Sequence, residues 1–204
     1  MKLGILGGTR LSVTLGKKYL DSGLDVIFGV RNEFDIQAIS WRIYNTFLDN
    51  VIDLEEAIEN SEVLLICCEN VHLKHIVEKL KSTDLEGKIL IDCTNSTEYK
   101  DLYCNTALIR SQIKDVPLFK AYNNLGIDYP KSEFFGPGKE TYFCGETGPE
   151  KLKVKRLIEL IGYRAIDSGG LENAALLEAF FHLKREITSQ KNEPFNFQFQ
   201  LLPC

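Results

Sequence analysis

The sequence predicts an α/β protein with a doubly wound, mostly parallel sheet. Short apolar segments alternate along the chain with segments whose apolar residues recur at helical spacing. The connections between apolar segments are too long for hairpins, which favours parallel strands joined by crossover helices. Residues 63–68 are six apolar residues without alternation, which is typical of a strand covered on both faces.

The expected elements follow this alternation. Residues 2–8 predict a buried strand that ends in a glycine turn, and Leu11, Leu15 and Leu20 then recur at helical spacing until Ser22 and Gly23 stop the helix. Further strands are expected at residues 25–29, 47–51, 63–68, 88–93, 117–121, 140–144 and 163–167, and further helices at residues 36–44, 54–58, 73–80, 148–161 and 171–187. Residues 94–115 are expected to be irregular, and residues 124–140 to form a long loop.

Length and composition indicate one domain over residues 1–190 with a tail at 191–204. The chain has 204 residues, of which 44% are hydrophobic, so it can bury a full core. Its 24 Lys and Arg residues against 29 Asp and Glu residues give a net charge of -5, without the basic stripe of a nucleic-acid binder. No apolar run reaches the roughly 18 residues of a membrane span. A cytoplasmic protein is expected.

The cysteines are expected to be reduced and structural. None of the six forms a CxxC pair or has a spacing to histidine that suits zinc. Cys67, Cys68 and Cys93 lie in apolar runs, where a thiol behaves as a small hydrophobe. A redox role for one of them is the alternative.

The first turn is a modified nucleotide-binding loop. A dinucleotide site needs a tight glycine turn that aims backbone N–H groups and a helix N-terminus at the pyrophosphate. Here Gly8 keeps the first glycine of the pattern, whereas Arg10 and Val13 replace the other two, and Gly16 partly relieves the packing that Val13 disturbs. Two interpretations of Arg10 stay open: its side chain fills the phosphate site, or its guanidinium swings out and binds the phosphate.

The end of the second strand favours NADP over NAD. NAD enzymes usually carry an acidic residue there, about 20 residues after the glycines, that binds the ribose hydroxyls. This chain has Arg31 at that point, and a guanidinium suits the 2′-phosphate of NADP. A solvated surface arginine is the alternative.

Several motifs resemble those of the deazaflavin-coenzyme-dependent NADP oxidoreductases, and of the reductase domain of STEAP-type ferric reductases. The resemblance covers about residues 1–185. The motifs that carry it are residues 6–9 (LGGT), 30–32 (VRN), 92–95 (DCTN), 120–123 (KAYN), 144–146 (CGE), 167–171 (DSGGL) and 173–178 (NAALLE).

Ligands of a doubly wound sheet bind at the carboxyl ends of the strands, so the residues expected to matter are 7–13, 29–33, 68–72, 93–97 and 121–127. The resemblance implies that the domain is of the NAD(P)-binding, Rossmann-like kind. The resemblance also implies that the adenosine phosphates are bound by Thr9, Val30, Arg31 and Asn32. The glycine turn itself adds further candidate cofactor-binding residues, which are Gly7, Gly8, Arg10, Leu11 and Ser12. Those implied to line the nicotinamide and its acceptor are Cys68, Glu69, Asn70, Thr94, Asn95, Ala121 and Asn123. Hydride transfer between two flat rings requires close stacking and exclusion of water rather than acid–base residues, and no catalytic residue is assigned.

Two features outside these motifs also bear on function. His72 and His75 are three residues apart on a predicted helix, but lack an obvious third metal ligand; His72 lies either beside the cofactor and substrate or at a plain capping position. The alternating tail would add an edge strand or cover a partner subunit in a homodimer.

The predicted function is an oxidoreductase that uses NADP(H) to transfer hydride to a flavin-like, deazaflavin-like or other small acceptor. The alternative is a catalytically silent relative that acts as a nucleotide sensor or interaction protein.

Overall fold

A computed structural model describes residues 1–30, 48–97, 104–125 and 140–189. The helix predicted at residues 36–44, most of the predicted loop 124–140 and the tail 191–204 lie outside these residues.

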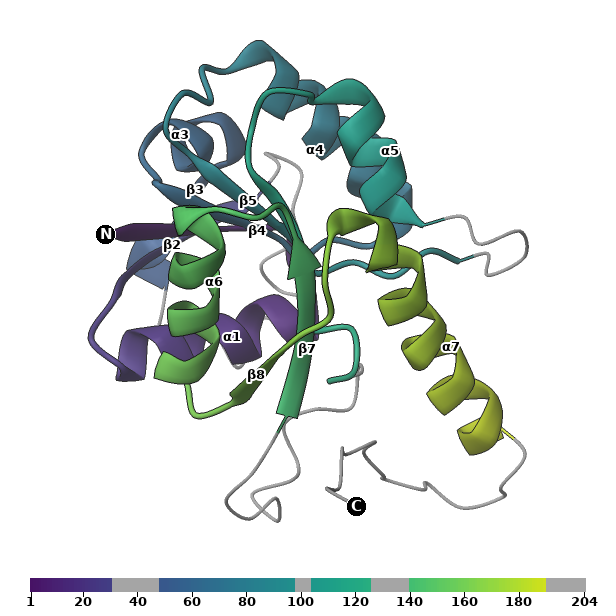
Figure 1. Cartoon of the computed structure of the whole chain (residues 1–204). Coiled ribbons are helices and arrows are strands. Elements are labelled where there is room, and N and C mark those ends of the chain that lie inside the picture. The colour runs from purple at the N-terminus through teal and green to yellow at the C-terminus, as the bar shows by residue number, and fades with distance from the viewer. Residues whose placement is uncertain (31–47, 98–103, 126–139, 190–204) are drawn as a thin grey trace.

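The strands form one eight-stranded sheet in the order β3-β2-β1-β4-β5-β6-β7-β8 (Figure 1). The first six strands in this order are parallel, whereas β7 pairs antiparallel with β6 and parallel with β8. The strands are β1 (Lys2–Leu6), β2 (Asp25–Val30), β3 (Val51–Asp53), β4 (Val63–Ile66), β5 (Ile89–Asp92), β6 (Leu118–Ala121), β7 (Glu140–Gly145) and β8 (Arg164–Asp167). The predicted fold class is confirmed.

Helices cover both faces of this sheet, as a doubly wound fold requires. One face carries α1 (Arg10–Asp21) and α6 (Pro149–Leu160), and the other carries α3 (Leu54–Glu59), α4 (Asn70–Ser82) and α5 (Asn105–Gln112). The last helix, α7 (Ala174–Ser189), packs beside β7, and short 3-10 turns form at η1 (Leu48–Asn50) and η3 (Leu171–Asn173).

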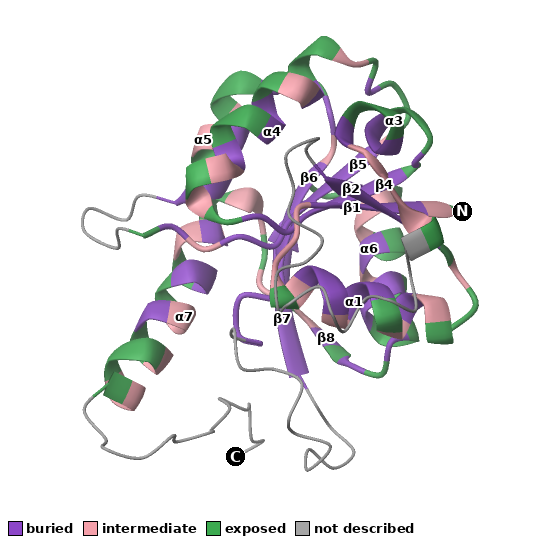
Figure 2. Cartoon of the chain, turned by 180° about the vertical axis from the view of Figure 1, so that it is seen from behind, coloured by how far each residue is buried: buried purple, intermediate pink, exposed green. Residues whose placement is uncertain are grey.

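Alternate residues of the central strands supply the two cores. In β4, Val63 and Leu65 pack toward α1 and α6, whereas Leu64 and Ile66 pack toward α3 and α4. All four are at most 1% exposed. Figure 2 shows the same burial along the other central strands. Burial on both faces explains why this strand has no polar alternation in the sequence.

The structure corrects two predictions of local structure. The stretch 94–115 contains the helix α5, whose buried residues are Asn105, Thr106 and Ile109. Because two of these three are polar, the helix has no apolar period for the sequence to reveal. The strand expected at 47–51 begins only at Val51, after the 3-10 turn η1.

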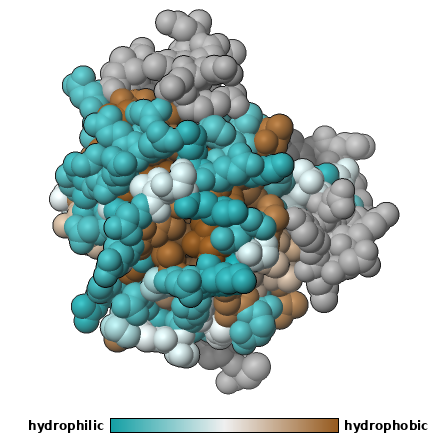
Figure 3. All heavy atoms as spheres, turned by 90° about the horizontal axis from the view of Figure 1, so that it is seen from above, coloured by the Kyte–Doolittle hydropathy of each residue, from teal (hydrophilic) through white to brown (hydrophobic). Residues whose placement is uncertain are grey.

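Figure 3 shows one face on which hydrophilic side chains surround a central group of hydrophobic ones. Among the described helices, none combines the length and apolar character needed to cross a bilayer.

Candidate functional site

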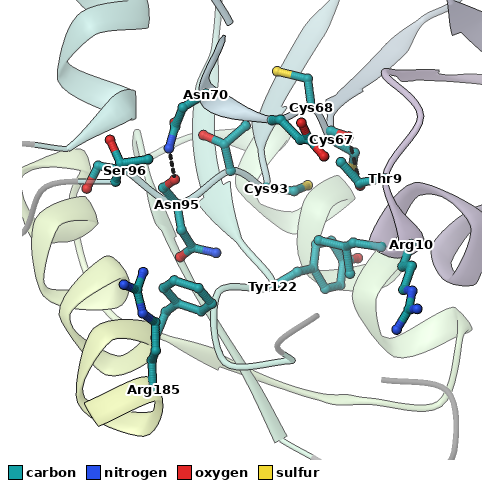
Figure 4. A pocket seen from close by; sticks show the side chains of 15 residues that line it. Thr9, Arg10, Cys67, Cys68, Asn70, Cys93, Asn95, Ser96, Tyr122 and Arg185 are labelled. Carbon is teal, nitrogen blue, oxygen red and sulfur yellow. Dashed lines mark hydrogen bonds between the residues drawn. The ribbon is translucent and has the colours of Figure 1, made fainter. Parts of the chain in front are cut away.

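A cavity of about 350 Å³ lies where the carboxyl ends of β1, β4, β5 and β6 meet (Figure 4). The chain order reverses between β1 and β4, and open α/β sheets bind ligands at such switch points. The cavity is lined by Thr9, Arg10, Leu11, Cys67, Cys68, Glu69, Asn70, Cys93, Thr94, Asn95, Ser96, Thr97, Tyr122, Phe181 and Arg185.

The turn after β1 brings the backbone unusually close to the end of β4. Gly7 has a φ of +111°, and a Cβ atom there would lie 2.8 Å from the Cys67 carbonyl oxygen. Only glycine fits both constraints. Thr9 then caps α1: its hydroxyl accepts from the Ser12 amide at 3.3 Å and donates to the Cys67 carbonyl at 2.9 Å. The N-terminus of α1 is thereby held at the cavity, where its amides favour an anion.

The side chain of Arg10 is directed outward from the turn. The side chain is exposed and lies on the cavity wall, with its guanidinium directed away from the other labelled residues in Figure 4. It therefore does not fill the space above the turn. No carboxylate within the described residues pairs with it, and no acidic residue stands in the first turn of α1.

Gly16 takes over the packing role of the missing third glycine. A Cβ atom at Gly16 would lie 2.2 Å from the Phe28 ring, so the contact between α1 and β2 depends on this glycine. Val13 is 9% exposed and joins the same core cluster. The compensation by Gly16 expected from the sequence is confirmed.

Thiols form the floor of the cavity. Cys67 and Cys68 follow β4, and Cys93 follows β5, all within the first residues beyond the strand ends. Burial raises the pKa of Cys68 to about 12, and burial likewise raises the pKa of Cys93, with Cys67 beside it. Cys68 and Cys93 therefore stay protonated near neutral pH and present a weakly polar surface.

The loop after β5 presents an amide to the cavity. Asn70 donates to the Asn95 backbone carbonyl at 2.7 Å, and the Asn123 amide donates to Asn95 Oδ1 at 2.7 Å and to the Thr94 carbonyl at 2.9 Å. With Oδ1 of Asn95 already bonded, its NH₂ group is left as the donor that faces the cavity. Within the described structure, the buried Oδ1 atom of Asn123 lacks a hydrogen-bond donor.

A fully buried ion network supports this loop from below. Lys120 Nζ donates to Asp92 Oδ2 at 2.8 Å, to Glu178 Oε1 at 2.6 Å and to the Thr94 carbonyl at 2.6 Å. Glu178, on α7, also accepts from the backbone amides of Ser96 at 2.7 Å and Asn105 at 3.0 Å. Burial alone would lower the pKa of Lys120, but the two carboxylates offset that effect and raise it, so the lysine is charged.

Tyr122 completes the wall in a strained conformation. It is the non-glycine residue with positive φ (69°) in the described chain, and its side chain is 1% exposed. Its hydroxyl is 2.6 Å from the Tyr19 hydroxyl on α1, which links the end of β6 to that helix. Burial, and then the neighbouring Tyr19, raise the pKa of Tyr122 well above its ordinary value. Strain of about 1–2 kcal/mol at such a position is typical of a functional site.

The structure brings together about half of the predicted site residues. Eight of them line the cavity: Thr9, Arg10, Leu11, Cys68, Glu69, Asn70, Thr94 and Asn95. Three others contact lining residues without lining the cavity themselves, namely Gly7, Ser12 and Asn123. The remaining candidates in the described chain are not among the lining residues; these are Gly8, Val30, Ala121 and His72. Arg31 and Asn32 lie outside the described residues.

The sequence missed lining residues from two sources. Cys67, Cys93, Ser96, Thr97 and Tyr122 follow strands whose ends were expected to matter, so their position was the available signal. Phe181 and Arg185 come from α7, and nothing in the sequence placed that helix beside the strand ends. The described residues contain no group of three potential metal ligands, and His72 is half-buried in the first turn of α4.

Comparisons with known proteins show what this chain resembles in sequence and in fold. Residues 2–96 match the family model described as NADP oxidoreductase, coenzyme F420-dependent. The metalloreductase STEAP3 of Rattus norvegicus is 25% identical over 181 residues, which cover 87% of this chain. The chain spans only 36% of that relative's length.

Solved structures share the fold. A protein from Arthrobacter sp. FB24, provisionally named an F420-dependent NADP-reductase, superposes with a TM-score of 0.81 at 17% identity and covers 98% of this chain and 100% of its own. A reductive aminase from Aspergillus terreus, solved with NADPH and ethyl levulinate, gives a TM-score of 0.64 at 16% identity, over 92% of this chain and 61% of its own. The chain therefore has the fold of NADP-binding Rossmann-like reductases, and its first half resembles the F420-dependent NADP oxidoreductases, as its motifs predicted.

Proposed function

We propose that the protein is an NADP(H)-dependent oxidoreductase that reduces a small acceptor with a flat ring, such as a flavin or deazaflavin. The observation that carries this proposal is the cavity at the switch point, with the N-terminus of α1 at one end and the Asn95 amide at the other. The family match over residues 2–96 and the NADPH named for the structural relative support the same cofactor.

The residues around the cavity suit a dinucleotide. Gly7 allows the turn after β1 to pack closely against the end of β4. Thr9 caps the helix N-terminus that would bind the pyrophosphate, and Arg10 offers it an unpaired guanidinium. The 2′-phosphate would be bound by Arg31, beyond the end of β2. The Asn95 NH₂ group would donate to the carboxamide of the nicotinamide, and Asn70 and Asn123 hold it in place.

NADPH would supply the hydride. The protein's own part is to place the acceptor ring against the nicotinamide and to exclude water from the thiol-lined floor. A flat-ring acceptor is favoured over an imine, because an imine also needs a proton donor. Cys68, Cys93 and Tyr122 hold their protons too tightly for that role near neutral pH, and Glu69 is exposed.

Titration of the protein with NADPH and NADH, read by nucleotide fluorescence, tests the cofactor assignment. We expect Arg31→Glu to weaken NADPH alone, because only NADPH carries the 2′-phosphate. Arg10→Ala should weaken both nucleotides by about tenfold, because both carry the pyrophosphate. Lys17→Ala, which removes an exposed positive charge farther along α1, is the control.

Two results would contradict the proposal. If neither NADPH nor NADH binds at millimolar concentration, the protein is not an oxidoreductase that uses these nucleotides. Tighter binding after Arg10→Gly would show that Arg10 blocks the site, and would favour the silent relative instead.

The proposal includes a homodimer and a cytoplasmic location, with residues 1–190 as one domain. The exposed side chains of Leu176 and Leu183 lie seven residues apart on α7, and they would be covered in a dimer. Sedimentation of the purified protein tests the oligomeric state.

A further inference from the structure

Two arginines stand at opposite ends of the cavity. Arg10 comes from α1, and Arg185 comes from α7, more than 170 residues later in the chain. Figure 4 shows Arg185 on the same side of the cavity as Asn95, whereas Arg10 lies on the opposite side, beyond Tyr122. The pyrophosphate that the α1 N-terminus would bind lies at the Arg10 end of the cavity.

Arg185 has no carboxylate partner in the described part of the chain. The carboxylate of Glu178, two turns earlier on α7, is 2% exposed and is bonded to Lys120 and to two backbone amides. Glu186 is the next residue along the helix, and adjacent helical residues do not face each other. A cation on a cavity wall is therefore left for a ligand.

An amide donor and an aromatic ring line the cavity together with Arg185. The Asn95 NH₂ group faces the cavity, and the Phe181 ring lies one helical turn before Arg185 on the same wall. This end of the cavity thus combines an aromatic face, a neutral donor and a positive charge. Such a wall suits a flat ring that bears an anionic substituent.

The dinucleotide does not supply that anion. The pyrophosphate would lie at α1 and the 2′-phosphate at the end of β2, so the nicotinamide would lie near Asn95. The nicotinamide ring itself carries no anionic group. Any anion at Arg185 must belong to the second substrate.

We propose that the hydride acceptor carries a carboxylate or phosphate that Arg185 binds. This inference rests on the proposed function, since it names the class of acceptor for the same site. It makes Arg185 a specificity-determining residue that α7 contributes to a site otherwise built from strand ends.

Matched flavins test the inference. Riboflavin and FMN share one ring and differ in a phosphate, and a flavin with a carboxyalkyl chain distinguishes a carboxylate from a phosphate. Binding to the NADP⁺-saturated protein is read by quenching of flavin fluorescence, and turnover is read separately by NADPH oxidation. The variants are Arg185→Leu and the control Arg156→Leu, which removes an exposed charge from α6.

We expect the wild type to bind at least one anionic flavin about tenfold more tightly than riboflavin, as one partly exposed ion pair with hydrogen bonds allows. Arg185→Leu should abolish that preference and leave riboflavin binding unchanged, while Arg156→Leu should keep it. High salt should reduce the preference in both the wild type and Arg156→Leu, because salt screens the exposed ion pair that both retain.

The outcomes separate the inference from the proposed function. Equal binding of the charged and neutral flavins, an unchanged preference in Arg185→Leu, or no flavin binding at all would overturn the inference. Arg185-dependent anion preference without NADPH oxidation would support the inference and contradict the proposed flavin reduction. Oxidation of NADPH by both flavins without dependence on Arg185 would do the reverse.

Discussion

Replacement of Lys120 by methionine is the most direct test of how the site is supported. Lys120 is fully buried and lies within 2.8 Å of Asp92 and 2.6 Å of Glu178, which are also buried. Methionine keeps most of the side-chain volume but removes the charge and three hydrogen bonds. The two carboxylates would then be left in the interior without a cation.

The expected loss is large because the two pairs are desolvated. Removal of one partner from a buried ion pair typically costs about 3–5 kcal/mol, since the remaining charge is uncompensated. For a domain of this size, that corresponds to a fall of very roughly 6–20 °C in the melting temperature. The loop 93–97 should also loosen, because Lys120 and Glu178 bond the Thr94 carbonyl and the Ser96 amide.

Urea unfolding near neutral pH, followed by circular dichroism, measures this loss. Lys17→Met is the control, because the Lys17–Asp21 pair is exposed on α1 and should contribute at most about half a kcal/mol. The penalty of Lys120→Met should shrink in mildly acidic buffer, where the stranded carboxylates can take up protons. A loss below about 1 kcal/mol, or a penalty independent of acid, would refute the ion network as the support of this loop.

Three further outcomes follow from buried hydroxyls, charges and thiols. Tyr19→Phe or Tyr122→Phe alone should cost about 1–2 kcal/mol in urea unfolding, because each strands the other hydroxyl, whereas the double variant should cost less than the sum. The free energy of unfolding should fall as the pH rises above about 10. The reason is that the pKa values of Tyr19, Tyr122 and Lys120 are raised in the folded state, so the unfolded chain loses these protons first. A urea midpoint that stays constant between about pH 8 and 11 would contradict this. Treatment with iodoacetamide near pH 8, mapped by mass spectrometry, should leave the five buried thiols unmodified until the protein is unfolded; these are Cys67, Cys68, Cys93, Cys104 and Cys144. Rapid labelling of the native protein would contradict this.

The motifs that carried the family resemblance turn out to hold the site together. Asp92, Lys120 and Glu178 come from three separate motifs, and they meet in one buried ion network. The cavity itself is lined by their neighbours, such as Asn95 and Tyr122. These motifs therefore mark the site through the residues that support it rather than through those that line it.

The sequence by itself determined the fold class and the edge of the sheet at which the site lies. Apolar strands without alternation indicate a parallel sheet with helices on both faces, and such a sheet has its ligand edge at the carboxyl ends of the strands. Local rules of this kind were enough to place Thr9, Asn70 and Asn95 at one edge. They were not enough to recognise α5, whose buried face is largely polar.

Only the tertiary structure decided what each side chain does at that edge. It directed Arg10 outward, and it joined the Tyr122 hydroxyl at the end of β6 to the Tyr19 hydroxyl on α1. It also placed Arg185 across the cavity from the nucleotide turn. These outcomes depend on contacts between residues far apart in the chain, which no periodicity or local motif encodes.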